Sequence, residues 1–324
     1  MSFGQLKPIV GGEQVVTHEY PFVVYLSIET KPNWHAVCGG TLVSPEHVIT
    51  AGHCLYNAPS PSSIRVGYGD TAVKKQERTH AAEYFIHPDF DPRTLSNDIA
   101  VIRLAKPIQQ TRTAHRIPVY FGGVEAGQLI TAMGWGVTSN APGAHTVQVM
   151  NRVDLHVADA KMCRRVDETF DSNNGPFICT GTQPGNKDEC NGDSGSPAII
   201  TMVNGRPRTI QETAPGRLSR QQDLGPVADM RLIGLTSYGD NADHDPHPPC
   251  GDPSGFGFST HIAYYTDFIL QVTGLTKDRL QEPIKFDRLA EAPKPSGGAR
   301  AVDPMAGLHL WLIIALVASW LLRR

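Results

Sequence analysis

Short apolar runs separated by turn residues recur along most of the chain. Residues 22–26, 101–104 and 232–235 are rich in valine, isoleucine and leucine, and clusters of Gly, Pro, Asn and Asp stand between such runs. Apolar runs of about four to eight residues bounded by turn residues are typical of β-strands. We therefore expect an all-β fold from about residue 21 to residue 262.

The pattern changes after residue 262. Apolar residues then recur at near-helical spacing, among them Tyr265, Phe268, Ile269 and Val272, which predicts a helix at about 263–272. Residues 275–304 are rich in Pro, Ala, Gly and charged residues. This composition predicts a flexible stalk.

Residues 305–322 are mostly apolar and are followed by two arginines. Their length reaches the lower limit for a membrane-spanning helix, so we expect this hydrophobic segment to anchor the protein in a membrane. Two other interpretations stay open. The small residues at 296–299, ahead of the apolar tail, fit a lipid-anchor signal, and a buried terminal helix has a similar composition.

The chain has 324 residues, of which 40% are hydrophobic and 19% are charged. These fractions are typical of a globular protein with a sizeable core. All-β units of about 200 to 250 residues often form one domain, so one module with terminal appendages fits this length. The formal net charge of -3 provides no basic footprint for nucleic acid, and no nucleic-acid partner is expected.

Three short segments carry the residue types of a nucleophilic enzyme. The segment TAGHC holds His53, SNDIAV holds Asp98, and ECNGDSGSP places Ser194 in a glycine-rich turn. A serine hydroxyl becomes a good nucleophile when a neighbouring base takes its proton, and a carboxylate can orient that base. The order His, Asp, Ser is that of the chymotrypsin triad and differs from the orders in subtilisin and the α/β-hydrolases.

Together with IVGG at residues 9–12, these segments resemble the trypsin-like (chymotrypsin-family) serine proteases, from about residue 9 to about residue 274. The resemblance implies two six-stranded antiparallel β-barrels, at about 9–120 and 121–262, with the active site between them. It makes Ser194 the nucleophile, His53 its base and Asp98 the carboxylate that orients the imidazole. The backbone N–H groups of Gly192 and Ser194 would form the oxyanion hole. The implied activity is that of a serine endopeptidase.

The resemblance also implies a pocket for the substrate residue before the cleaved bond. Asp188, six residues before the nucleophile, matches the pocket floor and predicts cleavage after Arg or Lys. Ser237, Gly239 and Gly257 match positions in the pocket wall. A surface position for Asp188 and a chymotrypsin-like preference remain as alternatives.

Maturation is the point at which the chain departs from the family pattern. In relatives, cleavage before IVGG frees an α-ammonium group that pairs with the acid preceding the catalytic serine; these residues are Ile9 and Asp193 here. Pro8 precedes Ile9, so an activator with trypsin-like preference is not expected to cut there. Residues 1–8 are interpreted as the remnant of a leader or propeptide; they contain no apolar secretory signal, and we expect the natural start to lie upstream. The competing hypothesis is a catalytically silent, protease-like binding module.

Six cysteines allow 15 different sets of three disulfides, and the residues alone do not choose among them. The family resemblance implies the pairs Cys38–Cys54, Cys163–Cys179 and Cys190–Cys250. Lasting disulfides indicate an oxidising compartment, so we expect the secretory pathway and an extracellular or cell-surface location. No closely spaced cysteine pair suggests a zinc site.

No cofactor or metal is expected. The cluster Asp240, Asp243, His244, Asp245 and His247 is favoured as a solvated turn over a cation site. Residues 72–78 match a loop that binds calcium in many relatives, but here that loop is mainly positively charged. The expected partners are protein or peptide substrates, protein inhibitors, and a membrane through residues 305–322.

Overall fold

The computed structural model describes residues 12–16, 18–137, 140, 145–181, 190, 192–210, 229–245 and 249–285. All of them belong to one unit, which spans residues 1–291. Residues 292–324 form a second unit, and they lie outside the described residues together with the hydrophobic segment 305–322. No helix among the described residues is long and apolar enough to cross a membrane.

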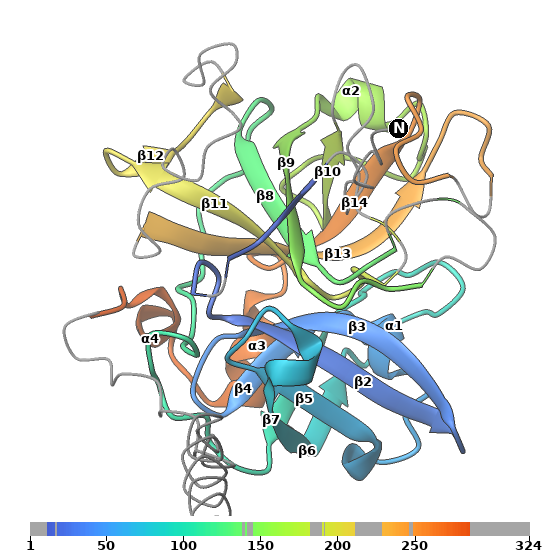
Figure 1. Ribbon diagram of the computed structural model, residues 1–324. Helices are drawn as coiled ribbons and strands as arrows, with labels where there is room; N and C mark the ends of the chain where they lie inside the picture. Colours follow the sequence, from blue (N-terminus) through green and yellow to red (C-terminus); the bar gives the residue numbers. More distant parts are fainter. Residues whose placement is uncertain are drawn as a thin grey trace, which may run out of the picture. The chain divides into compact units, whose positions relative to one another are not determined.

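Six antiparallel strands from the first half of the chain close into a barrel (Figure 1). Strand β2 shows the alternation of side chains along a strand. Val24, Leu26 and Ile28 are buried in one apolar cluster, whereas Tyr25 between them points to the other face and is buried in a second cluster. In order around the barrel the strands are β2 (Val23–Lys31), β3 (Trp34–Leu42), β4 (His47–Thr50), β7 (Ala100–Leu104), β6 (Glu77–Ile86) and β5 (Ile64–Tyr68).

A second ring of six antiparallel strands follows. Its core contains Ile130, Ile178, Ile200 and Ile233. Around the ring the strands are β8 (Leu129–Gly134), β9 (Asn151–Val157), β10 (Phe177–Gly181), β14 (Phe256–His261), β13 (Met230–Asp240) and β11 (Pro197–Val203), which pairs again with β8. Two short strands extend it, since β1 (Glu13–Gln14) pairs with β9 and β12 (Arg206–Pro207) with β11. The prediction of two six-stranded barrels is confirmed.

Helices are short and few among the described residues. They are α1 (Gly52–Leu55), η1 (Pro61–Ser63), η2 (Val73–Lys75), α2 (Ala160–Cys163), α3 (Thr266–Thr273) and α4 (Lys277–Gln281). Helix α3 begins a few residues later than predicted, because residues 262–265 form turns before it. It ends at Gly274, whose φ of 66° is the left-handed conformation that commonly terminates helices.

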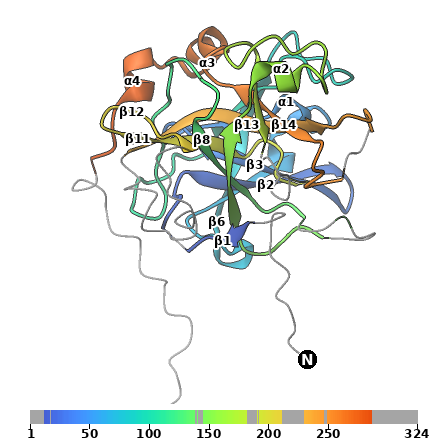
Figure 2. The same ribbon diagram turned by 90° about the horizontal axis from the view of Figure 1, so that it is seen from above.

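Helix α4 lies within the interval 275–304 that was predicted to be a flexible stalk. Leu280 is fully buried, and its carbonyl accepts a hydrogen bond from the Val119 N–H at 2.8 Å. Arg116 donates to the Glu282 carbonyl at 2.8 Å. The start of this interval is therefore packed onto the chain that connects the two barrels, at the same edge as α3 (Figure 2). One apolar side chain in a polar sequence is too weak a pattern to predict such packing.

All six cysteines form disulfides, in the three expected pairs. Cys38–Cys54 joins β3 to α1 beside His53, and Cys163–Cys179 joins α2 to β10. Cys190–Cys250 closes a loop of 60 residues and holds the segment before Ser194 against the chain that follows β13.

Candidate active site

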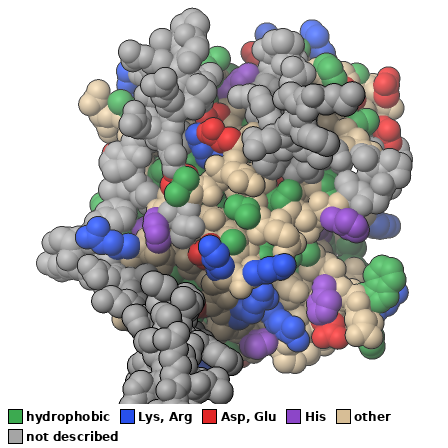
Figure 3. All heavy atoms as spheres, viewed as in Figure 1, with side chains coloured by type: hydrophobic (Ala, Val, Ile, Leu, Met, Phe, Trp, Pro, Cys, Tyr) green, Lys and Arg blue, Asp and Glu red, His purple; other side chains and the backbone are tan. Residues whose placement is uncertain are grey.

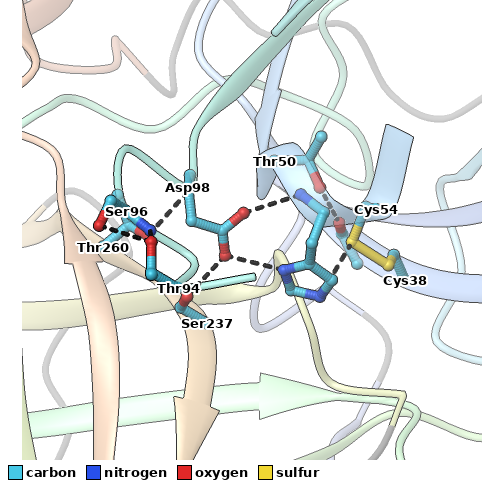
Figure 4. Close-up of polar contacts among 10 residues, drawn as sticks. Cys38, Thr50, Cys54, Thr94, Ser96, Asp98, Ser237 and Thr260 are labelled. Atoms are coloured by element: carbon cyan, nitrogen blue, oxygen red, sulfur yellow. Dashed lines mark hydrogen bonds and ion pairs between the residues drawn. A yellow bond between two sulfur atoms is a disulfide. The ribbon is translucent and has the colours of Figure 1, made fainter. Parts of the chain in front are cut away.

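The pairing of β4 with β7 brings His53 and Asp98 together. Thr50 at the end of β4 lies opposite Ala100 at the start of β7, so the residues just beyond these ends become neighbours. Asp98 accepts two hydrogen bonds from His53, one from the backbone N–H at 2.7 Å and one from Nδ1 at 2.8 Å (Figure 4). Because a carboxylate only accepts, Nδ1 carries the proton and Nε2 of the neutral ring is left as a base.

Asp98 is completely buried, and two further contacts stabilise it. The Ser237 hydroxyl donates to its carboxylate at 2.5 Å, and the Thr260 hydroxyl donates to its backbone carbonyl at 2.8 Å (Figure 4). Ser237 belongs to β13 and Thr260 to β14, whereas Asp98 and His53 belong to the first barrel. The site therefore lies where the two barrels meet. The sequence placed Ser237 in the pocket wall and did not single out Thr260.

The turn that carries Ser194 is held by backbone hydrogen bonds on both sides. Asp193 N–H donates to Cys190 O at 2.9 Å, and Gly195 N–H donates to Thr236 O at 2.8 Å. On the first barrel, Gly39 N–H donates to the Ser194 carbonyl at 2.8 Å. Gly195 has a φ of 73°, and a Cβ atom there would lie 2.2 Å from the Thr50 hydroxyl oxygen. Only glycine fits this position, so the turn rests directly against the strand that leads to His53.

Ser194 itself is partly exposed, and no hydrogen bond joins its hydroxyl to His53 among the described contacts. His53 Nε2 has the Cys54 sulfur as a neighbour at 3.9 Å. The structure thus joins Asp98 to His53 and holds the Ser194 backbone against Gly39 of β3, without a hydrogen bond between the Ser194 hydroxyl and His53 among the described contacts. Hydrogen bonds between catalytic groups are often long in the absence of substrate and tighten when it binds.

The predicted oxyanion-hole donors lie in the same turn. Neither the Gly192 N–H nor the Ser194 N–H donates to a described residue. Gly192 has a φ of 96°, which a residue with a side chain rarely adopts. Two uncommitted N–H groups this close together form a suitable site for an oxygen that acquires negative charge.

Asp193 is buried and accepts hydrogen bonds from two backbone N–H groups, those of Gly136 at 2.7 Å and Cys190 at 3.0 Å. A Cβ atom on Gly136 would lie 2.4 Å from the Asp193 carboxylate, so glycine is required for this approach. Removal from water makes a buried carboxylate costly unless hydrogen bonds or a nearby cation stabilise it. Ile9, the predicted source of that cation, lies outside the described residues.

Of the predicted pocket, the structure describes the residues of the wall. Asp188, the predicted floor, lies outside the described residues. Gly239 of β13 and Gly257 of β14 are directly paired. Next to them, on the other face of the sheet, the Tyr238 ring stacks on Phe258 with 4.7 Å between centroids. Two opposed glycines place no side chain on this face of the sheet.

Tyr238 is a site neighbour that sequence reasoning missed. Its hydroxyl donates to Asp167 at 2.7 Å, and burial together with this carboxylate raises the pKa of Tyr238. Burial alone would raise the pKa of Asp167, but hydrogen bonds from Thr169 and Tyr238 lower it below its usual value. The phenol therefore stays a neutral donor and holds the aromatic ring in place beside the predicted pocket wall.

Metal-ligating groups come together at one place among the described residues, where donor atoms of Cys38, His53 and Cys54 lie within 4.8 Å of one another. The two sulfurs are bonded to each other, so this group is not suited to a metal. In the turn after β13, His244 lies 3.6 Å from the Asp240 carboxylate and Asn241 accepts from the Asp245 N–H at 3.1 Å. His247 of that cluster is outside the described residues.

Comparison with known proteins agrees with this geometry. The family model described as Trypsin matches residues 9–269, which is most of the chain. The chain belongs to the trypsin family. This membership makes it a serine-type endopeptidase by class, and the two barrels and three disulfides described above are consistent with that class.

Several curated relatives support the same conclusion. Trypsin-1 from Astacus astacus is 30% identical over 270 residues, which cover 81% of this chain and 98% of that protein. Cathepsin G from Mus musculus is 31% identical over 201 residues, covering 60% of this chain and 73% of the relative. Serine protease 56 from Homo sapiens is 29% identical over 295 residues, covering 88% of this chain. The chain spans 42% of the length of that last relative.

Proposed function

We propose that this trypsin-family protein cleaves peptide bonds through a triad of Ser194, His53 and Asp98. The observation that carries the proposal is the buried Asp98 carboxylate, which accepts from both the backbone and Nδ1 of His53. These two bonds hold the ring in one orientation and one tautomer. The other ring nitrogen, Nε2, is then the base available to the serine of the neighbouring turn.

The reaction follows from these positions. Nε2 of His53 takes the Ser194 proton as the hydroxyl oxygen attacks the peptide carbonyl, and buried Asp98 stabilises the resulting imidazolium. The carbonyl oxygen becomes an oxyanion beside the N–H groups of Gly192 and Ser194. The imidazolium then gives its proton to the leaving amine. Water, activated by the same histidine, hydrolyses the acyl-enzyme and restores Ser194.

The triad is tested by covalent labelling. A fluorophosphonate probe should attach to Ser194 in the mature protein, as located by peptide mass spectrometry. The Ser194→Ala variant should lose labelling, whereas Ser254→Ala, at an exposed serine of a turn, should keep it. Wild-type protein that has a free Ile9 and does not react would contradict the proposal.

For specificity we propose cleavage after Arg or Lys, with Asp188 as the acid of the pocket. The support is its place six residues before Ser194 and the open pair Gly239 and Gly257. Peptide substrates that differ only in the residue before the cut should show the preference. Asp188→Ser should lower kcat/KM for Arg and Lys substrates by about a hundredfold or more, since it leaves a cation without its partner. A wild-type preference for aromatic residues would instead favour the chymotrypsin-like alternative.

Activation is proposed to depend on the α-ammonium group of Ile9 pairing with Asp193. Gln14 of β1 pairs with Asn151 of β9, and Asn151 pairs with Gly134 of β8. A Cβ atom on Gly134 would lie 2.3 Å from the Asp193 carboxylate. Two strand spacings of about 5 Å therefore separate Gln14 from this acid, which the residues between Ile9 and Gln14 can span.

N-terminal sequencing of the natural protein tests the activation step. A chain that begins at Ile9 and hydrolyses peptides supports the enzyme. A natural chain that retains Pro8 and has no activity supports the competing hypothesis of a protease-like binding module.

We further propose that the protein works outside the cytosol and that residues 305–322 tether it to a membrane. The supports are the three disulfides and the apolar composition of that segment. Release from cells by a phospholipase that cuts lipid anchors would identify a lipid anchor. Retention after this treatment and after alkaline carbonate washing would identify a spanning helix.

A further inference from the structure

A group of basic side chains covers one exposed face of the first barrel. This basic face consists of Arg65 on β5, Lys74 and Lys75 on η2, and Arg78 and His80 on β6, all of which are exposed. Figure 3 shows Lys and Arg side chains gathered on the side of the molecule that carries β2 and β5 in Figure 1. The whole chain has a net charge of -3, so this concentration of positive charge is local.

Strand register explains why the cations share a face. Arg65 lies directly opposite His80, and Gly67 lies opposite Arg78. The alternate positions Val66 and Tyr68 point to the other side, where both belong to or pack against the barrel core. Glu77 is opposite Tyr68 in the same register and accepts its hydroxyl at 3.2 Å. Glu77 therefore sits on the side away from Arg78 and His80.

The four permanent cations of the basic face lack carboxylate partners among the described residues. Elsewhere in the described chain, arginines form ion pairs, as in Arg93–Asp91, Arg103–Glu83, Arg116–Glu282, Arg152–Asp154 and Arg279–Glu282. Arg65, Lys74, Lys75 and Arg78 form no such pair, and Arg78 donates only to the Val73 carbonyl. Asp70, an acid that precedes η2, accepts from the Ala72 N–H. Like charges that share one face repel one another, so a bound anion is favoured there.

One edge of the basic face lies against the segment that leads to the candidate active site. The N–H of Val73, in η2, donates to Gln148 O at 3.0 Å, and Ala72 pairs with Val149. The same segment returns to Trp135, whose carbonyl accepts from Val147 N–H at 3.0 Å. Trp135 is followed by Gly136, which contacts Asp193. A substrate chain leaving the catalytic serine on this side would approach the basic face.

We propose that the basic face binds an acidic segment of the protein substrate, at a distance along the substrate chain from the cleaved bond. An extended peptide presents side chains on one side about every 6.6 to 7 Å, which is the repeat of alternate positions along β5 and β6. Aspartate and glutamate carboxylates match the two arginine forks, and the lysines add charge without strict geometry. The identification of the acidic ligand as a substrate rests on the proposed function. The charge complementarity between the basic face and an acidic peptide does not depend on that function.

The direct test measures binding without catalysis. Full-length protein carrying Ser194→Ala is titrated into a labelled ten-residue peptide in which glutamate alternates with small residues, and fluorescence anisotropy is recorded at low and at physiological salt. We expect Lys74→Glu/Lys75→Glu to weaken binding about tenfold or more at low salt and to reduce its salt dependence. The matched control Lys106→Glu/Lys161→Glu makes the same charge change at exposed lysines elsewhere and should alter binding less than twofold.

Two results would overturn the proposal. One is equal weakening by both double variants, which would show that only net charge matters. The other is a loss of heparin binding in Lys74→Glu/Lys75→Glu while peptide binding stays unchanged. This result would assign the basic face to a sulfated polysaccharide. Circular dichroism and thermal unfolding of each variant confirm that the fold is kept.

A kinetic experiment distinguishes acidic-peptide binding by the basic face from the proposed proteolytic activity. Active protein is given two substrates with the same cleavage site, one followed by a glutamate-rich segment and one by a neutral segment. Lys74→Glu/Lys75→Glu should raise KM for the acidic substrate about tenfold and leave kcat and the neutral substrate unchanged. Absence of hydrolysis by the wild type would refute the proposed activity, while the anisotropy titration would still decide whether the basic face binds acidic peptide.

Discussion

At the scale of single residues, the most informative atom group is the buried carboxylate of Asp98. Four donors surround this residue: the backbone and ring of His53, the hydroxyl of Ser237 on the carboxylate, and the hydroxyl of Thr260 on the backbone carbonyl. A fully buried carboxylate is stable only when such donors replace water. The same donors fix the direction in which Asp98 supports the histidine.

Ser237 should therefore contribute to catalysis without contacting the reacting atoms. Ser237→Ala removes a hydrogen bond to a charged, buried acceptor, a loss of about 1.5 to 3 kcal/mol. We expect kcat/KM to fall about ten- to hundredfold, with most of the loss in kcat and a changed pH profile. Steady-state kinetics over a pH series tests this, and Ser237→Thr should recover part of the activity. Unchanged kcat with a raised KM would instead indicate that Ser237 acts only in the pocket wall.

At the scale of elements, α4 shows how a short helix can become part of a fold through one side chain. Thr276 caps it by accepting from Arg279 N–H at 3.3 Å, and Leu280 inserts into the main core cluster. The Lys277 ammonium group lies 4.8 Å from the centre of the Phe121 ring. An isolated helix of this length is unstable in water, so tertiary packing must hold it.

Leu280→Ala should destabilise the protein by about 2 to 5 kcal/mol, because it leaves a cavity in the core. Denaturant unfolding followed by tryptophan fluorescence measures the change in the free energy of unfolding. Asp278→Ala, at an exposed position of the same helix, should change it by less than about 0.5 kcal/mol. Equal stability of wild type and Leu280→Ala would mean that α4 is not docked.

At the scale of the whole molecule, stability combines two barrel cores, three disulfides and several buried polar groups. His261 is one of these groups, with Nδ1 at 3.0 Å from the Gly175 carbonyl and a buried Nε2 to which no described residue forms a hydrogen bond. Burial lowers the pKa of His261 below its usual value, although the hydrogen bond to Gly175 opposes this. The folded state therefore favours the neutral ring.

This lowered pKa makes stability depend on pH in a defined direction. Near and below the unfolded-state pKa of about 6.5, the unfolded chain binds a proton at His261 that the folded state binds only at lower pH. The contribution of His261 is thus fully present above about pH 7 and is lost as pH falls. Denaturant unfolding between pH 7.5 and 5 should show a flatter pH dependence for His261→Asn than for wild type. His80→Asn, at an exposed histidine, serves as control and should leave the slope unchanged.

The sequence by itself was sufficient to predict the all-β class, two barrels, and the three cysteine pairs through the family pattern. It also singled out His53 and Asp98, which the fold brings into contact, because the chemistry of a serine nucleophile requires a base and an acid in recognisable local motifs. The periodicity that defines a strand involves neighbouring residues only, so it can be read along the chain. The helix α3 was predicted for the same reason, with an error of a few residues at its start.

Only the tertiary structure decided which distant side chains share a partner. Ser237 and Thr260 reach Asp98 across 139 and 162 residues, and no local pattern encodes that meeting. The docking of α4 and the common face of Arg65 and Arg78 likewise depend on strand register and on which surfaces remain to be covered. Local pattern determines what each segment becomes, whereas the closure of the barrels determines which segments meet.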